Sequence, residues 1–278
     1  GMSPITPTVQ GGDVVSWEIH PTLPTGLSID STTGTISGTP AGTSPISSYT
    51  VYANNTGGSA TAVLTIEILE APPSSITYVP GSFTLTKGTP LGAVMPTAQG
   101  DPVASWSISP TLPSGLVFDT TNGELSGTPT AVSPLTTYTV TATNNGGSGT
   151  VTITIQVNDV APSSISYTPS FLELNKDTLM TTVTPTNQGG TVDTWSITPT
   201  LPNGLVFDTA TGSISGTPTD VTAQATYTVT GSNTGGSATA TVTVIVNDAA
   251  PTSIVYSPSS FTLTLGSQMQ SVEPTAQG

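Results

Sequence analysis

Few side chains in this 278-residue sequence could carry acid–base or nucleophilic chemistry. The sole histidine is His20, the sole lysines are Lys87 and Lys176, and arginine and cysteine are absent. A serine nucleophile needs a basic partner, and a glycosidase needs two carboxyl groups facing one substrate. The 16 acidic residues are instead spread along the chain, mostly at expected turns. We therefore predict that the protein is not an enzyme.

The charge balance excludes several classes of partner. The formal net charge is −14, and Lys and Arg together number only two. Binding to phosphates or to anionic lipid surfaces requires clusters of lysine and arginine, so nucleic acid is not an expected partner. No apolar run approaches the roughly 18 residues of a membrane span, so we expect no membrane insertion within this chain.

The sequence repeats itself with a period of 89 residues. Trp17, Trp106 and Trp195 follow one another at this spacing. Four further segments keep the same register, namely L-P-x-G-L from Leu23, Leu112 and Leu201, S-G-T-P from Ser37, Ser126 and Ser215, Y-T-V from Tyr49, Tyr138 and Tyr227, and Gly-Gly from Gly57, Gly146 and Gly235. Agreement at this many positions indicates tandem copies of one structural unit.

Each repeat has the pattern of short strands separated by turns. Val151, Ile153, Ile155 and Val157 alternate with polar residues, which is the period of a half-buried strand. The segment 144–147, Asn-Asn-Gly-Gly, is typical of a hairpin turn because asparagine and glycine accept positive φ. Several such strands in about 90 residues predict an all-β fold of tandem Ig-like β-sandwiches.

The repeat boundaries predict four segments. Residues 1–71 form an incomplete unit that lacks its first strands, 72–159 and 160–248 form complete units, and 249–278 supply only the opening strands of a further unit. An incomplete sandwich exposes apolar surface and a strand edge. We therefore expect the 249–278 segment to complete the first unit of a neighbouring chain, giving head-to-tail self-association. The alternative is a piece of a longer array.

The segments LPTGLSIDSTTGTISGTP, LPSGLVFDTTNGELSGTP and LPNGLVFDTATGSISGTP, starting at Leu23, Leu112 and Leu201, resemble the signature of the He_PIG (putative immunoglobulin) repeat family. The resemblance implies cadherin-like, Ig-like tandem domains of bacterial surface and secreted proteins. It therefore implies an extracellular or cell-surface location.

The signature also has a physical interpretation as a folding motif. Gly26, Gly115 and Gly204 each follow a Pro-x pair, as a tight turn requires. The aspartates of the signature precede Ser/Thr-rich turns, so we expect each carboxylate to accept backbone N–H bonds in an Asx turn. These aspartates are Asp30, Asp119 and Asp208.

The junctions between repeats resemble the calcium-binding linker of cadherins. They read V-N-D-V-A-P from Val157 and V-N-D-A-A-P from Val246, and the resemblance implies calcium as a cofactor. The candidate ligands are Glu70, Asn158, Asp159, Asn247 and Asp248. The first junction has Leu69 and Glu70 in place of Asn and Asp, and the partner motifs of cadherins are missing. The alternative is that Asn-Asp caps a strand end and that the following proline stiffens the linker.

Two classes of function remain open. The near-identity of the units favours a structural or adhesive array, a stalk or spacer in which proline-containing junctions limit bending. The alternative is a module that binds an extracellular protein or a glycan through loops at the ends of the sandwiches. The segments that vary most between repeats are Ala41–Ser48, Ala131–Thr137 and Asp220–Thr226.

Overall fold

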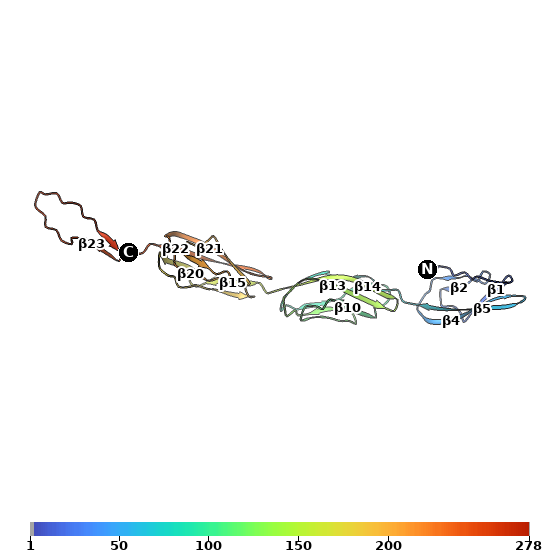
Figure 1. The fold of residues 1–278 in the computed structure, drawn as a ribbon. Helices are drawn as coiled ribbons and strands as arrows, with labels where there is room; N and C mark the ends of the chain where they lie inside the picture. The colour runs from blue at the N-terminus through green and yellow to red at the C-terminus, as the bar shows by residue number, and fades with distance from the viewer. Residues whose placement is uncertain (1–2, 278) are drawn as a thin grey trace. The chain divides into compact units, whose positions relative to one another are not determined.

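A computed structural model describes residues 3–277, which divide into two compact units between Gln156 and Val157. The described residues form 24 strands and no helix (Figure 1). It follows that residues 3–277 contain no helix long and apolar enough to cross a membrane. The all-β class expected from the alternating pattern is confirmed.

The first sandwich contains five strands. They are β1 (Ser16–His20), β2 (Leu27–Ile29), β3 (Ile36–Gly38), β4 (Ser44–Asn55) and β5 (Gly58–Ile68). One sheet has the order β1-β4-β5, and β2 pairs with β3 in the other. Ile5 bridges to Ile36 beside β3. Within residues 3–71 no described strand lies on the outer side of β5, which is therefore an edge.

The second sandwich has nine strands. They are β6 (Ser74–Thr77), β7 (Ser82–Thr86), β8 (Leu91–Val94), β9 (Thr97–Gln99), β10 (Ser105–Ser109), β11 (Leu116–Phe118), β12 (Leu125–Gly127), β13 (Ser133–Asn144) and β14 (Gly147–Asn158). The larger sheet has the order β10-β13-β14-β7, the second has the order β11-β12-β8, and β6 pairs with β9. Here β7 covers the edge that remains open in the first sandwich.

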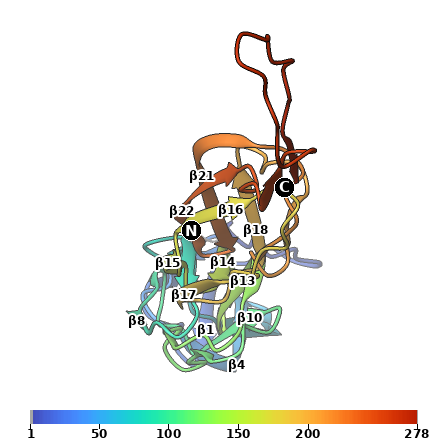
Figure 2. The ribbon, with the colours of Figure 1, turned by 90° about the vertical axis from the view of Figure 1, so that its left-hand side faces the viewer.

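The third sandwich repeats the four-stranded sheet. Its strands are β15 (Pro162–Tyr167), β16 (Phe171–Asn175), β17 (Pro185–Gly189), β18 (Thr194–Thr198), β19 (Leu205–Phe207), β20 (Ile214–Gly216), β21 (Thr222–Asn233) and β22 (Gly236–Asn247). The sheet order is β16-β22-β21-β18, and these strands can be followed in Figure 2. The second sheet of this sandwich contains only β19 and β20. The pairing of β16 with β22 is parallel, with Leu172 opposite Val244.

The predicted alternation of buried and exposed residues is present in the long strands. Ile153, Ile155 and Val157 of β14 are buried, and the polar residues between them are partly exposed. The Asn-Gly turn predicted between the long strands joins β13 to β14. Alternation places one face of each sheet against the core and the other in solvent, as expected for a sandwich.

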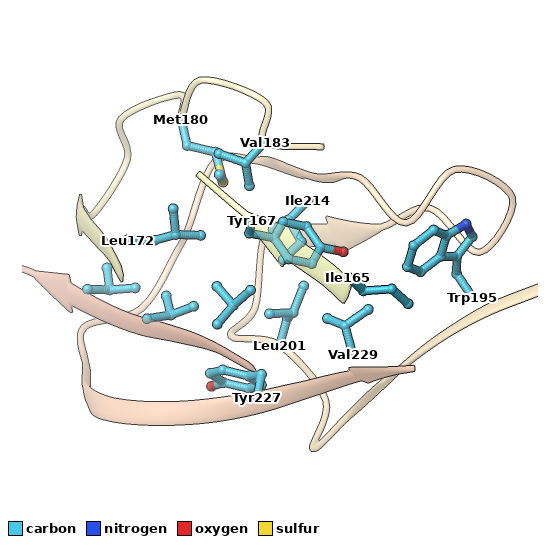
Figure 3. Packing of buried hydrophobic residues seen from close by; sticks show 13 residues of the cluster. Ile165, Tyr167, Leu172, Met180, Val183, Trp195, Leu201, Ile214, Tyr227 and Val229 are labelled. Carbon is cyan, nitrogen blue, oxygen red and sulfur yellow. The ribbon is translucent and has the colours of Figure 1, made fainter. Parts of the chain in front are cut away.

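The third sandwich shows how the core is assembled. Its buried cluster includes Ile165 and Tyr167 of β15, Trp195 of β18, Ile214 of β20 and Val229 of β21 (Figure 3). Burial of each such aliphatic side chain contributes about 1.5–3 kcal/mol. The opening strand β15 therefore supplies part of the core, in addition to covering it.

In the two complete sandwiches, a tyrosine at the end of the opening strand is hydrogen-bonded to the signature turn. The hydroxyl of Tyr78 donates to the carbonyl oxygen of Gly123 at 2.6 Å, and Tyr167 makes the equivalent bond to Gly212. Burial raises the pKa of both tyrosines to about 12. A Cβ added at Gly123 would lie 2.8 Å from Cδ2 of Trp106, so the indole ring requires glycine there. The opening strand, the signature turn and the tryptophan thus form one packed unit.

The first sandwich lacks this unit among the described residues. Leu64, Ile66 and Ile68 of β5 are half-buried, whereas their counterparts in β14 and β22 are fully buried. Gly34 is the repeat equivalent of Gly123, and a Cβ at Gly34 would meet the ring of Trp17 as one at Gly123 would meet Trp106. The turn and the tryptophan are therefore in place without an opening strand beside them.

The segment after the third sandwich, residues 249–277, is called the tail. Its strands β23 (Ser253–Val255) and β24 (Thr275–Gln277) pair with each other in an antiparallel hairpin. Between them Phe261, Leu263 and Leu265 are exposed. This long loop of the tail is drawn in red in Figure 1.

Candidate functional site

The first junction is joined to the hairpin turn of the second sandwich. The Glu70 N–H donates to Oδ1 of Asn145 at 3.0 Å, and the Asn145 N–H donates to Oε2 of Glu70 at 3.3 Å. The Ala71 N–H donates to Oδ2 of Asp101 at 2.7 Å. The Glu70 carboxylate, expected as a calcium ligand, is here a hydrogen-bond acceptor for the turn.

The acidic residues of the later junctions cap their own backbone. Oδ1 of Asp159 accepts from the Val160 N–H at 3.0 Å, and Oδ1 of Asp248 accepts from the Ala249 N–H at the same distance. Each of these bonds joins a carboxylate to the backbone N–H of the next residue.

The two junction asparagines end the long strands of their sandwiches. Asn158 is the last residue of β14, and Asn247 is the last residue of β22. Nδ2 of Asn247 donates to Oε1 of Glu173 at 3.1 Å. Within residues 3–277 no three His, Cys, Asp or Glu side chains lie close enough together to hold a metal ion. Calcium binding at these residues stays a prediction of the cadherin resemblance.

A second asparagine contact holds the chain as it enters each complete sandwich. Nδ2 of Asn144 donates to the Ala71 carbonyl oxygen at 2.8 Å, while its Oδ1 accepts from the Gly146 N–H at 3.0 Å. In the third sandwich Nδ2 of Asn233 donates to the Val160 carbonyl oxygen at 2.7 Å. We call this contact, together with the glycine described next, the junction clamp.

The glycine of the junction clamp lets the two backbones touch. A Cβ added at Gly146 would lie 1.8 Å from the carbonyl oxygen of Glu70, and one at Gly235 would lie 2.0 Å from that of Asp159. In the first sandwich a Cβ at Gly57 meets only Oδ1 of Asn55, at 3.2 Å. The sequence predicts only a hairpin turn for this Asn-x-Gly segment. Its recurrence at the 89-residue period was the available signal.

The three signature aspartates form the Asx turns predicted from the sequence. Oδ1 of Asp30 accepts from the Thr32 N–H at 2.7 Å, and Asp208 makes the same bond to Ala210. The pKa of Asp30 and of Asp208 is lowered mainly by these backbone N–H bonds. The Thr121 side-chain hydroxyl, 2.6 Å from Oδ1, is the main cause of the lowered pKa of Asp119. The three carboxylates therefore hold the backbone of the signature turn.

The variable segments considered for ligand recognition include the beginnings of the long strands β4, β13 and β21. Ile46 and Leu135, at equivalent positions, are 67% and 63% exposed, and Gln224 stands at that position in the third sandwich. The β4 and β21 ladders shift register here, between Ser44 and Ser47 in the first sandwich. In β4 this bulge displays the apolar side chain of Ile46, and in β21 it displays Gln224.

His20 lies at the end of β1 and is exposed. Its Nε2 lies 3.8 Å from Oε2 of Glu18, which is also exposed, and its ring packs edge-on against Tyr52. An exposed pair of this kind contributes little to stability. Neither of these contacts gives His20 a nucleophile to activate. The absence of enzymatic activity stays a prediction.

Comparison with known families identifies the repeat. The profile of the He_PIG family, described as "Putative Ig domain", matches residues 1–69, 73–158 and 161–247. The three matches include all the strands from β1 to β22.

Curated relatives include bacterial adhesins. The "Serine-rich adhesin for platelets" of Staphylococcus aureus is 32% identical over 147 residues, which is 52% of this chain and 6% of the adhesin. The protein of the same name from strain N315 is 30% identical over 174 residues, 62% of this chain and 7% of the adhesin. The chain thus spans under a tenth of the length of these relatives.

Solved structures with similar folds contain tandem Ig domains. The N-terminal eight Ig domains of Down Syndrome Cell Adhesion Molecule match with 16% identity and a TM-score of 0.45, covering 86% of this chain and 33% of that chain. The titin I-band fragment I67-I69 matches with 16% identity and a TM-score of 0.39, covering 84% and 87%.

The junction clamp makes a specific prediction for glycine substitutions. Gly146→Ala places a methyl group against the Glu70 carbonyl, so we expect it to lower the free energy of unfolding of the second sandwich by about 1–3 kcal/mol. Hydrogen exchange of the intact chain in dilute solution, read by peptide mass spectrometry, measures this for each sandwich. Gly57→Ala is the matched control, and we expect a change within about 0.5 kcal/mol. Equal costs for the two substitutions would contradict the clamp.

Proposed function

Because the chain belongs to the He_PIG family of Ig domains, we propose that it is a non-enzymatic structural and adhesive repeat array of a bacterial surface or secreted protein. In this role the sandwiches space an adhesive region away from the cell. The adhesin relatives support a location at the surface or outside the cell.

The observation that carries the proposal is the repeated junction clamp. In the first junction only Leu69 lies between the end of β5 and the clamped residue Glu70. In the second, Asp159 follows directly after the end of β14 and donates through its N–H to Oγ1 of Thr234 at 2.9 Å. We expect the hydrogen bonds of such a short junction to restrict its backbone dihedrals. Limited bending is the property that a spacer requires.

The repetition of the clamp also supports a spacer. A dedicated binding or catalytic site would make one unit different from the others, whereas the signature turn recurs in all three sandwiches and the clamp in both complete ones. In repeat arrays each unit contacts only its neighbours, so length can be gained by adding copies of one unit.

Small-angle X-ray scattering tests the spacer proposal. A 12-residue strand such as β13 is roughly 40 Å long, so an extended array of three sandwiches, as the spacer proposal requires, would have a radius of gyration above about 30 Å. A compact globule of this chain length would have about 19 Å. We expect the larger value for the dilute protein. A value near that of the globule would contradict the proposal.

A second candidate function is recognition of an extracellular protein or glycan at the variable segments. It is favoured by the exposed apolar side chains of Ile46 and Leu135 at the ends of two sandwiches. The name of the relatives adds that they are adhesins for platelets, which makes a protein or glycan of a host surface the class of ligand to test. Single exposed apolar residues are also common on ordinary surfaces.

Glycan and matrix-protein arrays probed with the chain separate the two functions. A chain that acts only as a spacer gives no reproducible binding. Binding that is lost in the double variant Ile46→Gln, Leu135→Gln would establish the second function instead, because glutamine is the residue at this position in the third sandwich. The matched control is Val63→Gln, which changes an exposed apolar residue on β5 away from the variable segments.

Calcium at the junctions is tested by thermal unfolding. If Asp159 and Asp248 act only as caps, calcium at about 10 mM, above the Kd range of extracellular calcium modules, leaves the Tm unchanged. Magnesium at equal ionic strength is the control. The backbone capping supports this outcome. An increase in Tm specific to calcium, lost in Asp159→Asn and Asp248→Asn, would establish the cation site implied by the cadherin resemblance.

A further inference from the structure

The chain that enters the third sandwich is held by the turn between β21 and β22. The Asp159 N–H donates to Oγ1 of Thr234 at 2.9 Å, and the Val160 carbonyl oxygen accepts from Nδ2 of Asn233 at 2.7 Å. A Cβ added at Gly235 would lie 2.0 Å from the Asp159 carbonyl oxygen, so the two backbones touch. We call Asp159 and Val160 the entry segment.

The same turn leads into the strand by which the chain leaves the sandwich. β22 begins at Gly236, directly after the turn, and ends at Asn247. At that far end the Asn247 carbonyl oxygen accepts from the Lys176 N–H at 2.9 Å, and Nδ2 of Asn247 donates to Oε1 of Glu173. One strand of 12 residues therefore connects the place where the chain is held on entry with the place where it leaves.

The opening strand β15 follows the entry segment, and its pairing is irregular. It pairs with β17 through a ladder whose register shifts between Ser163 and Ser166. Its side chains Ile165 and Tyr167 belong to the core. A pull on the chain just before Pro162 would therefore detach β15 from its first pair onward and withdraw core side chains, unless another part of the sandwich carried the tension.

We propose that the third sandwich contains a load path that carries tension past its opening strand. Tension passes from the entry segment through its hydrogen bonds to Asn233 and Thr234, and then along the covalent backbone of β22 to Asn247. While these bonds hold, β15 and the core carry little of the load. Tension reaches β15 only after the bonds break.

The second sandwich has the same arrangement, as is required where several units share the tension of one chain. Its entry residues Glu70 and Ala71 are bonded to Asn145 and Asn144, at the turn between β13 and β14. β14 begins directly after that turn, and its last residue is followed at once by Asp159. The strand that carries tension through the second sandwich therefore leads into the next entry segment.

The load path acts over a limited range of force. A local contact of a few hydrogen bonds opens and closes reversibly, and tension shifts this equilibrium toward the open form. At low force the contact is mostly closed, and the opening strand is shielded. At high force it is open in every variant. Removal of the contact therefore has its full effect at low force and little effect at high force.

The origin of the tension is the surface role proposed above. A stalk that joins an adhesive region to a cell is pulled whenever the two attached surfaces separate. That origin rests on the proposed function, whereas the load path is a property of the third sandwich itself. A force measurement can therefore contradict the load path while scattering supports the spacer, and the reverse.

Optical tweezers at constant force test the load path. The sequence contains no cysteine, so two engineered cysteines provide defined points of attachment in the full chain. Handles at Thr152→Cys and Ala250→Cys pull through the entry segment, whereas handles at Ser163→Cys and Ala250→Cys pull directly on β15. All three positions are exposed. At equal low force we expect the third sandwich to survive about tenfold longer in the first geometry.

Two substitutions weaken the contact from the side of the turn. Gly235→Ala places a methyl group against the entry segment, and Thr234→Ala removes the acceptor of the Asp159 N–H. In the first geometry we expect Gly235→Ala to shorten the lifetime at low force about tenfold, and Thr234→Ala at least about threefold. In the second geometry we expect no change, because the entry segment is not under tension.

The matched control is Asn203→Ser. Nδ2 of Asn203 donates to Oδ2 of Asp220 at 2.9 Å, which is a bond of similar length away from the entry segment. Serine is the residue at this position in the second sandwich, where it is Ser114. We expect this substitution to leave the lifetime unchanged in both geometries.

Three results would overturn the load path. The first is an equal lifetime of the wild-type sandwich in the two geometries. The second is a shortening by Gly235→Ala that is the same in both geometries, which would make the contact a purely structural one. The third is an unchanged lifetime of both turn variants in the first geometry at low force.

Discussion

Each complete sandwich depends on the docking of its opening strand against the signature turn. The tyrosine hydroxyl that ends this strand satisfies a glycine carbonyl inside the protein, at Gly123 in the second sandwich and Gly212 in the third. An unpaired carbonyl in such a place costs about 1–3 kcal/mol. Only glycine fits at this position, because the ring of the tryptophan that recurs at the 89-residue period occupies the space of a side chain. The opening strand thus connects the turn, the tryptophan and the sheet edge into one core.

The junction clamp extends this dependence from one sandwich to the next. The chain that leaves one sandwich is held by the hairpin turn of the following one before it enters the opening strand, through Asn144 at the first junction and Asn233 at the second. A repeat is therefore completed by the segment immediately before its opening strand as well as by its own strands. In the first sandwich the equivalent asparagine, Asn55, donates through Nδ2 to the carbonyl oxygen of Asp13.

Local signals in the sequence predicted most of the fold. The 89-residue period and the alternation in β14 indicated the sandwiches, and the signature aspartates indicated Asx turns, because these features depend on neighbouring residues. The clamp was missed because Asn144 and its partner Ala71 are 73 residues apart, and an Asn-x-Gly turn reads the same with or without a docked strand. The calcium expectation came from a short string at the junction, where the structure shows the carboxylates of Asp159 and Asp248 accepting backbone N–H bonds.

Amide hydrogen exchange in β5, compared with the equivalent strands of the complete sandwiches, tests the dependence on the opening strand most directly. In the second sandwich the Thr154 N–H donates to the Gly81 carbonyl, and in the third the Thr243 N–H donates to the Ser170 carbonyl. Thr65 is the equivalent residue in β5. At concentrations too low for association, we predict that the Thr65 amide exchanges much faster than those of Thr154 and Thr243. Equal protection at the three positions would contradict the account, because it would show that β5 is stable without an opening strand beside it.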